Sequence, residues 1–171
     1  MILNNKLITV VTVVYNAENL VEETIQSVIN QTLFEEVEYI IIDGKSKDKT
    51  IEIINKYKDK IDILVSEPDN GIYDAMNKAI TLANGEWINF MNCADVFFDN
   101  NVLEKIANEI CRVGNDYSFI YSDTLFYDFN KNLDLKIVEA NHMVKRIIHQ
   151  SSIYKINLHK IHGKYLVKKG I

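Results

Sequence analysis

The hydrophobic positions of the chain form two patterns that alternate along the sequence. Continuous apolar runs rich in β-branched residues are typical of strands buried inside a sheet. Such runs occupy residues 7–15, 37–42, 61–65 and 87–91. Between them, apolar residues recur every three or four positions, which predicts amphipathic helices at 20–31, 48–57 and 72–83. Strands that alternate with helices predict a mostly parallel sheet covered on both faces.

Two of these helices carry candidate end signals. Ser46 or Asp48 is a suitable N-cap for the second helix, because a short polar side chain can accept a hydrogen bond from the first turn. Asn84-Gly85 is expected to end the third helix, since both residues tolerate the left-handed conformation of a helix stop.

Beyond residue 95 the alternation continues less regularly. The expected elements are a helix at 101–113 closed by Gly114, a strand at 119–123, a small antiparallel excursion within 124–145 and a strand at 149–154. The lysine-rich end from Lys155 shows no clear period and is expected to be a solvated face.

Length and composition restrict the class of protein. A chain of 171 residues, 47% hydrophobic and 25% charged, has room for one soluble domain with a core. The net charge of -5 argues against nucleic-acid binding, which usually needs a basic face. Cys93 and Cys111 lack metal-ligand spacing and are expected to be free buried thiols in a reducing compartment. With no signal peptide or spanning segment expected, the predicted location is cytoplasmic, and a role at the inner membrane face stays open.

Polar groups follow each of the four predicted buried strands where the strand ends. They are Tyr15 to Glu18, Asp43-Gly44, Glu67 to Asp69, and Asn92 to Asp95. Any one of these sites is readily explained as ordinary loop and cap chemistry. Parallel strands, however, bring their carboxyl ends to one edge of a sheet, where open α/β folds bind ligands. The sequence therefore predicts a binding crevice at this edge.

Candidate metal and nucleophile residues are fewer. A carboxylate pair at a strand end could hold a hard divalent cation that neutralises a departing diphosphate. Asp95 and Asp99 lie close in sequence, although Asp99 also suits the start of the next helix. His149 fits either a metal or phosphate contact or a structural role, and Cys93 fits a small buried side chain better than a nucleophile. The glycine-rich dinucleotide and P-loop motifs are absent.

The chain also resembles the family 2 glycosyltransferases, which have the GT-A nucleotide-sugar-binding fold, and is most similar to bacterial enzymes that build surface polysaccharides. The matching segments are residues 12–18, 24–32, 38–50, 66–79 and 85–92, followed by His149-Gln150. The resemblance implies an α/β, GT-A (Rossmann-like) three-layer sandwich with a mostly parallel central sheet. It also implies one domain, with residues 1–95 as the nucleotide-binding half and residues 96–171 as an incomplete acceptor-side half.

The resemblance implies roles for particular residues. The nucleotide-sugar-binding set would be Tyr15, Asn16, Glu18, Asp43, Asp69, Gly71, Tyr73, Asn77 and Asn92. Asp95, together with His149, would hold a divalent cation, Mn²⁺ or Mg²⁺. The implied partners are a nucleotide-diphosphate sugar, with a UDP-sugar favoured, and a saccharide or lipid-linked acceptor.

Two positions depart from the family pattern. The family usually reads Asn-(Ser/Ala)-Asp-Asp where this chain has Asn92-Cys93-Ala94-Asp95, so one carboxylate is replaced by Ala94. The family's general base is an Asp shortly after a Gly-x-(Phe/Tyr) segment. That segment corresponds to Gly163-Lys164-Tyr165, and no acidic residue follows Glu139. The base and the acceptor-binding part are therefore expected to be absent, and no catalytic residue is assigned.

The resemblance implies a glycosyltransferase that inverts the anomeric centre while transferring sugar to an acceptor hydroxyl in cell-surface polysaccharide biosynthesis, impaired by the missing base. The alternative is a non-catalytic remnant that binds nucleotide sugar or a partner protein. A phosphoacceptor domain built around Asp43 is a third and weaker alternative, because it leaves the Asp69 to Asp95 region unexplained. Exposed apolar surface near 153–167 is expected to favour self-association.

Overall fold

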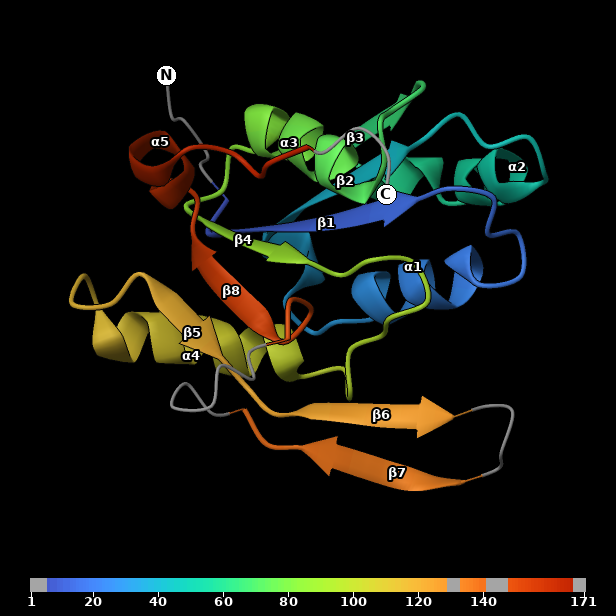
Figure 1. The fold of residues 1–171 in the computed structure, drawn as a ribbon. Helices are drawn as coiled ribbons and strands as arrows, with labels where there is room; N and C mark the ends of the chain where they lie inside the picture. The colour runs from blue at the N-terminus through green and yellow to red at the C-terminus, as the bar shows by residue number, and fades with distance from the viewer. Residues whose placement is uncertain (1–5, 129–132, 141–147, 168–171) are drawn as a thin grey trace.

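The computed structural model describes residues 6–128, 133–140 and 148–167, and its main feature is a six-stranded sheet in the order β3-β2-β1-β4-β8-β5 (Figure 1). The strands of this sheet are β3 (Ile63–Ser66), β2 (Val37–Asp43), β1 (Ile8–Val14), β4 (Trp87–Phe90), β8 (Ser152–Lys155) and β5 (Phe119–Tyr121). A separate antiparallel hairpin consists of β6 (Thr124–Asp128) and β7 (Leu133–Val138). The helices are α1 (Val21–Ile29), α2 (Thr50–Asn55), α3 (Ile72–Leu82), α4 (Val102–Val113) and α5 (Leu158–His162), with 3₁₀ turns at Phe34–Glu36 and Lys58–Lys60.

Four neighbouring strands of the sheet, β3, β2, β1 and β4, run parallel, as the apolar runs predicted. Their registers pair Val14 with Asp43, and Asp43 with Ser66, at the carboxyl ends. β8 is antiparallel to both of its neighbours, β4 and β5. The central sheet is therefore mostly parallel, and the predicted antiparallel excursion is confirmed as the β6–β7 hairpin.

The sheet is the middle of three layers. One face packs against α1, α2 and α4 through a cluster that includes Ile25, Ile54 and Leu103. The other face packs against α3 through Met76 and Ala79 (Figure 1). Every residue of β1 and β2 is buried, which accounts for their continuous apolar sequences. The predicted α/β three-layer fold is confirmed.

The predicted end of the third helix is wrong in its mechanism. The helix ends at Leu82, and the residue after it is extended rather than left-handed. Gly85 is needed for a different reason: a Cβ there would lie 2.6 Å from Thr9 Oγ1. Thr9 Oγ1 accepts the Gly85 amide and donates to Glu38, so this close approach is part of a buried hydrogen-bond network. The glycine is required by close packing against β1, which helix-stop chemistry does not reveal.

Three other boundaries differ from the sequence prediction. α2 begins at Thr50, and neither Ser46 nor Asp48 is its N-cap; Asp48 instead accepts hydrogen bonds from the Thr50 amide and hydroxyl. The strand expected at 149–154 is β8 and begins at Ser152, so His149 lies in the preceding turn. The lysine-rich end contains the short helix α5, which was not predicted.

The remaining expectations concern the surface and the thiols. Cys93 is half-buried and Cys111 is exposed, and both are free, so the prediction of a buried thiol is wrong for Cys111. Ile161 and Leu166 are 67% and 83% exposed, whereas Ile153 is buried. Within the part of the chain that the structure describes, no helix has the length and apolar character needed to cross a membrane.

Candidate functional site

The carboxyl ends of β1, β2, β3 and β4 meet at one edge of the sheet, where the loops that follow them lie together (Figure 1). Asp43 is the last residue of β2 and is fully buried. Gly44 continues the edge by donating its amide to Val14 O at 2.9 Å, and Cys93 donates to Val13 O at 3.2 Å. The structure thus brings the four predicted polar segments to the same edge.

The Asp43 carboxylate connects two of these loops. It accepts hydrogen bonds from the Ser46 hydroxyl at 2.5 Å and from the Ser66 hydroxyl at 2.6 Å, and a longer one from the Ser46 amide at 3.2 Å. Both carboxylate oxygens are therefore occupied inside the protein. A buried carboxylate is stable only with such partners, so Asp43 holds the edge together rather than facing outward.

Asn16 and Glu18 have a similar internal role. Asn16 Oδ1 accepts the Lys47 amide at 2.8 Å, and Glu18 Oε2 accepts the Lys49 amide at 2.9 Å. In return, Asp48 accepts the Glu18 amide at 3.1 Å. These bonds fasten the loop after β1 to the loop after β2. Asn16 is also held at a φ of 47°, a conformation that asparagine adopts more readily than most residues.

Tyr15, Gly44 and Asp69 form an open part of the same edge. The Tyr15 side chain is 57% exposed. A Cβ at Gly44 would lie 2.6 Å from Asp69 Oδ2 and 3.3 Å from the Tyr15 ring, so the glycine lets the two side chains approach each other. Asp69 Oδ1 accepts the Gly71 amide at 2.8 Å, which fixes the turn into α3. An aromatic face therefore lies near a carboxylate on an accessible surface.

The start of α3 contacts the C-terminal segment of the described chain. The Asn77 side chain makes two hydrogen bonds to the backbone of Tyr165, each 2.9 Å long. Asn77 Nδ2 donates to the Tyr165 carbonyl oxygen, and Asn77 Oδ1 accepts from the Tyr165 backbone amide. The Tyr73 ring lies 5.5 Å from the Tyr165 ring, measured between centroids. Asn77 is thus occupied by Tyr165, while Tyr73 remains 51% exposed.

The loop after β4 carries Asn92, Ala94 and Asp95. Asn92 Oδ1 is buried and has no hydrogen-bond partner among the described residues. Ala94 has a φ of 80°, which is unusual for a residue with a Cβ. Asp95 Oδ2 accepts a hydrogen bond from Gln150 Nε2 at 2.7 Å. Burial raises the pKa of the Asp95 carboxyl, and the Gln150 bond partly offsets this.

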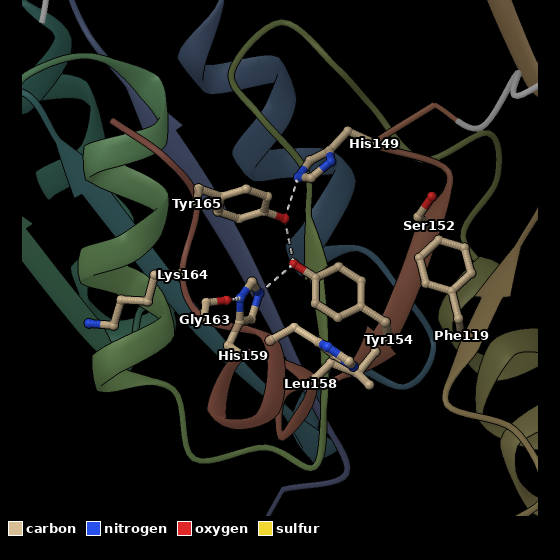
Figure 2. Close-up of a pocket in the computed structure, with 10 residues that line it drawn as sticks. Phe119, His149, Ser152, Tyr154, Leu158, His159, Gly163, Lys164 and Tyr165 are labelled. Atoms are coloured by element: carbon tan, nitrogen blue, oxygen red, sulfur yellow. Dashed lines mark hydrogen bonds between the residues drawn. The ribbon is translucent and has the colours of Figure 1, made fainter. Parts of the chain in front are cut away.

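His149 lies beside this loop and lines a cavity of about 360 Å³ (Figure 2). The other lining residues are Phe119, Ser152, Tyr154, Leu158, His159, His162, Gly163, Lys164 and Tyr165. Burial, followed by the nearby His159, lowers the pKa of His149, so the ring is neutral near pH 7. The His149 ring packs on Phe90 and hydrogen-bonds the Tyr165 hydroxyl at 3.2 Å.

The loop after β4 offers oxygen atoms of the kind that a divalent cation prefers, but too few to hold the ion by themselves. Across the described residues, no three His, Cys, Asp or Glu side chains gather closely enough to hold a metal by themselves. Asp95 offers the oxygen that Gln150 leaves free, and Asn92 Oδ1 is an unpartnered carbonyl-type oxygen. Mg²⁺ is commonly bound by one or two carboxylates together with substrate phosphates, which agrees with this small donor set.

The sequence matches the profile of Glycosyl transferase family 2 over residues 9–170. The chain belongs to this family. It is 34% identical over 125 residues to an uncharacterized glycosyltransferase of Haemophilus influenzae, covering 68% of this chain and 49% of that protein. It is 38% identical over 93 residues to the poly(ribitol-phosphate) beta-glucosyltransferase of Bacillus spizizenii, covering 52% and 15%. The chain thus spans about half the length of the first of these relatives.

Solved structures confirm the GT-A fold of this family 2 domain. Residues 1–349 of S. aureus TarS in complex with UDP match with a TM-score of 0.71 at 21% identity, covering 91% of this chain and 48% of that one. The mannosyltransferase PcManGT from Pyrobaculum calidifontis, in complex with GDP-Man and Mn²⁺, matches with a TM-score of 0.72 at 17% identity, covering 95% and 48%. At these identities the likeness concerns the fold alone.

Sequence reasoning missed several residues that shape the site of this family 2 domain. Ser46 and Ser66 hold Asp43, Gln150 holds Asp95, and Tyr165 holds both Asn77 and His149. Ser66 follows an apolar run and Gln150 follows a candidate histidine, so their positions gave a weak signal. Tyr165 was noted as part of the Gly163-Lys164-Tyr165 segment, but nothing in the sequence indicated its contact with Asn77, which is 88 residues away.

Replacing Asp43 tests its structural role. Asp43→Ala leaves two hydroxyl groups without their acceptor, and hydrogen bonds to a charged group contribute roughly 1.5–3 kcal/mol each. We expect the free energy of unfolding in urea to fall by about 3 kcal/mol. Asp69→Ala is the control, because that carboxylate accepts a single hydrogen bond, from the Gly71 amide. An equal effect of the two substitutions would contradict the central role of Asp43.

Proposed function

We propose that this domain transfers a sugar from a nucleotide-diphosphate sugar to an acceptor hydroxyl in cell-surface polysaccharide biosynthesis. The observation that supports this most strongly is the meeting of the loops after β1, β2, β3 and β4 at one sheet edge in a chain of glycosyl transferase family 2. Poly(ribitol-phosphate) is named in one relative, and UDP, UDP-GlcNAc and GDP-Man are bound in structural neighbours. Residues 1–95 form the nucleotide-binding half in this proposal.

The donor pocket is divided between residues that build the edge and residues that face the ligand. Asp43, Asn16 and Glu18 fix the loops through their hydrogen bonds. Tyr15 is exposed and presents an aromatic face, on which a nucleobase can stack. The neighbouring Asp69 carboxylate can accept hydrogen bonds from hydroxyl or imino groups of the nucleoside. A UDP-sugar is the donor favoured by this proposal.

The sugar end of the donor lies toward α3 and the loop after β4. Gly71 has a φ of 102°, and a Cβ at this position would meet no atom within 4 Å, so the backbone of this turn is open to a ligand. Tyr73 is exposed beside it, and Asp95, Asn92 and His149 follow along the edge. A cation held by Asp95 and His149, Mn²⁺ or Mg²⁺, would supply positive charge that neutralises the departing diphosphate.

Transfer with inversion requires the acceptor oxygen to attack the anomeric carbon while the bond to the diphosphate breaks. The diphosphate leaves with the electron pair of that bond, and a base takes the proton of the acceptor hydroxyl. No Asp or Glu follows Glu139 in the 171 residues. Asp123 Oδ1 accepts the Ala140 amide, so this carboxylate holds the base of the hairpin. The proposed acceptor is a saccharide or a lipid-linked saccharide.

The alternative function is binding of nucleotide sugar without transfer. The observation that favours it is Ala94, which stands where the family usually has a carboxylate and leaves the loop after β4 with fewer ligands for a cation. A cytoplasmic location at the inner membrane face would suit either function. Self-association through the exposed Ile161 and Leu166 remains a prediction.

Nucleotide binding is tested by Tyr15→Ala. Stacking between a base and an aromatic ring is worth roughly 1–3 kcal/mol, so we expect UDP affinity in calorimetry to fall about tenfold. Tyr117→Ala is the matched control, because Tyr117 is 61% exposed and distant from the proposed pocket. It precedes β5, which begins beside the amino end of β4, so it lies at the edge of the sheet opposite the carboxyl ends of the parallel strands. If both variants bind UDP like the parent, or the parent binds no nucleoside diphosphate or nucleotide sugar, the proposed pocket is wrong.

The role of position 94 is tested by Ala94→Asp. The substitution adds a carboxylate next to Asp95, and aspartate also tolerates a φ of 80° better than alanine does. We expect Mn²⁺ affinity in the presence of UDP to rise on the order of tenfold, or about 1.4 kcal/mol. Ala94→Asn shares the shape and the backbone tolerance but adds no charge, so it should give a much smaller gain. Equal affinities for the two variants would argue against a cation at this loop.

Transfer by the 171-residue chain is expected to be slow. A positioned general base contributes typically 10²–10⁴-fold, so sugar transfer to saccharide acceptors should be at least about a hundredfold slower than in a family member that has this base. Release of UDP, measured with and without acceptor, gives the rate. Rapid acceptor-dependent release that is lost in Asp128→Asn or Glu139→Gln would overturn this expectation and identify the base.

A further inference from the structure

A continuous chain of hydrogen bonds connects His149 to the C-terminal segment (Figure 2). His149 Nε2 lies 3.2 Å from the Tyr165 hydroxyl, which lies 2.6 Å from the Tyr154 hydroxyl. The Tyr154 hydroxyl lies 3.0 Å from His159 Nε2, and His159 Nδ1 lies 3.1 Å from the carbonyl oxygen of Gly163. The chain therefore runs from a backbone carbonyl, through three side chains, to the histidine next to Gln150.

The carbonyl at one end fixes the direction of every proton in the chain. A carbonyl oxygen only accepts, so His159 Nδ1 carries a proton and, in the neutral ring, Nε2 is an acceptor. Tyr154 must then donate to His159 Nε2, and Tyr165 must donate to Tyr154. Each hydroxyl has one proton, so Tyr165 has none left for His149. The remaining contact is satisfied only if His149 Nε2 carries a proton and donates it to the Tyr165 oxygen.

The ionisation states of the two tyrosines agree with this ordering. Burial raises the pKa of Tyr154 and that of Tyr165, so both hydroxyls keep their protons at neutral pH. The opposite ordering with neutral rings would place two lone pairs against each other at the 3.0 Å contact between Tyr154 and His159. Buried polar contacts of that kind are costly.

We propose that Tyr165, Tyr154 and His159 are positioning residues that hold His149 as the Nε2–H tautomer and leave Nδ1 as the nitrogen that binds a ligand. Nδ1 has no hydrogen-bond partner among the described residues. A proton on one ring nitrogen, fixed by a hydrogen bond, determines which nitrogen can coordinate a metal. The ligand assigned to Nδ1 is the divalent cation, and this identity rests on the proposed function.

Tyr165 is well placed to transmit this constraint. Its backbone is held by the two hydrogen bonds to Asn77, and its ring packs against Tyr73 and, at 6.2 Å, against Phe90. The hydroxyl is thereby fixed between α3 and the turn that carries His149. The segment after α5 consequently determines which ring nitrogen of His149 carries the proton. Tyr165 is 16 residues from His149 and 11 residues from Tyr154 in the sequence.

The tautomer can be measured directly on the free protein. At about pH 8, well above the ordinary histidine pKa of about 6.5, long-range ¹H–¹⁵N spectra distinguish a protonated from an unprotonated ring nitrogen. We expect His149 to show an unprotonated Nδ1 and a protonated Nε2, and His159 to show the reverse. Tyr165→Phe keeps the ring and the Asn77 contact but removes the acceptor, so His149 should become a mixture of tautomers.

Two controls separate the hydrogen-bond chain from general packing. Tyr73→Phe alters a ring that touches Tyr165 outside the chain of hydrogen bonds, and His162→Asn alters a cavity residue that forms no part of that chain. Both variants should leave the His149 tautomer unchanged. A His149 with a protonated Nδ1 in the parent protein, or an unchanged tautomer in Tyr165→Phe, would overturn the proposal.

A second measurement tests the ligand. Loss of a residue that orients a metal ligand typically costs 10–100-fold in metal affinity, so Tyr165→Phe should weaken UDP-dependent Mn²⁺ binding by about tenfold or more, while His162→Asn should not. Unchanged Mn²⁺ affinity with an altered tautomer would refute the cation as the Nδ1 ligand. If neither protein binds UDP, the proposed function fails, and the tautomer result still decides the hydrogen-bond chain.

Discussion

The arrangement of the candidate site depends on the buried carboxylate of Asp43. It lies at the carboxyl end of β2 and binds the hydroxyls of Ser46 and Ser66, which belong to the loop after β2 and to the end of β3. A buried carboxylate has to be saturated with donors, so the charge itself determines how these two segments close over the edge. Ser46 in turn accepts the Asn16 amide at 2.8 Å, which adds the loop after β1. The exposed Tyr15 ring and the Asp69 carboxylate, whose Oδ1 accepts the Gly71 amide, are presented on this fixed frame.

The sequence was sufficient for the parallel part of the sheet, because strands buried on both faces need continuous apolar runs. The sequence of β8 did not show that the strand is antiparallel, since the residue pattern of a short strand is the same in both directions. α5 has five residues, too few for a helical repeat of apolar positions to be recognised. Gly85 was recognised as a special position, but its cause is contact with Thr9, on a strand 76 residues earlier. Local patterns identify elements well, and they do not identify the close approaches between elements.

The candidate site shows the same division. The order of strands and loops was enough to predict that Asp43, Asp69 and Asp95 share an edge. Which side chains bind a ligand and which bind the protein could not be predicted, because the partners of Asn16 and Asn77 lie 31 and 88 residues away. The family resemblance placed every candidate residue in one nucleotide-sugar pocket. The hydrogen bonds divide these residues into those that connect the loops to each other and those that remain exposed. His149 belongs to both groups, with one nitrogen held by Tyr165 and the other without a described partner.

We propose that the carboxyl edge of the parallel strands binds the nucleotide diphosphate. Backbone amide chemical shifts of the ¹⁵N-labelled protein, recorded during titration with UDP and Mg²⁺, can locate the bound ligand. We expect the amides of Asn16, Gly44, Gly71 and Asp95 to shift together with one affinity, while those of Gly114 and Tyr117 at the opposite edge stay unchanged. Shifts concentrated at the opposite edge, or confined to the cavity beside α5, would contradict it.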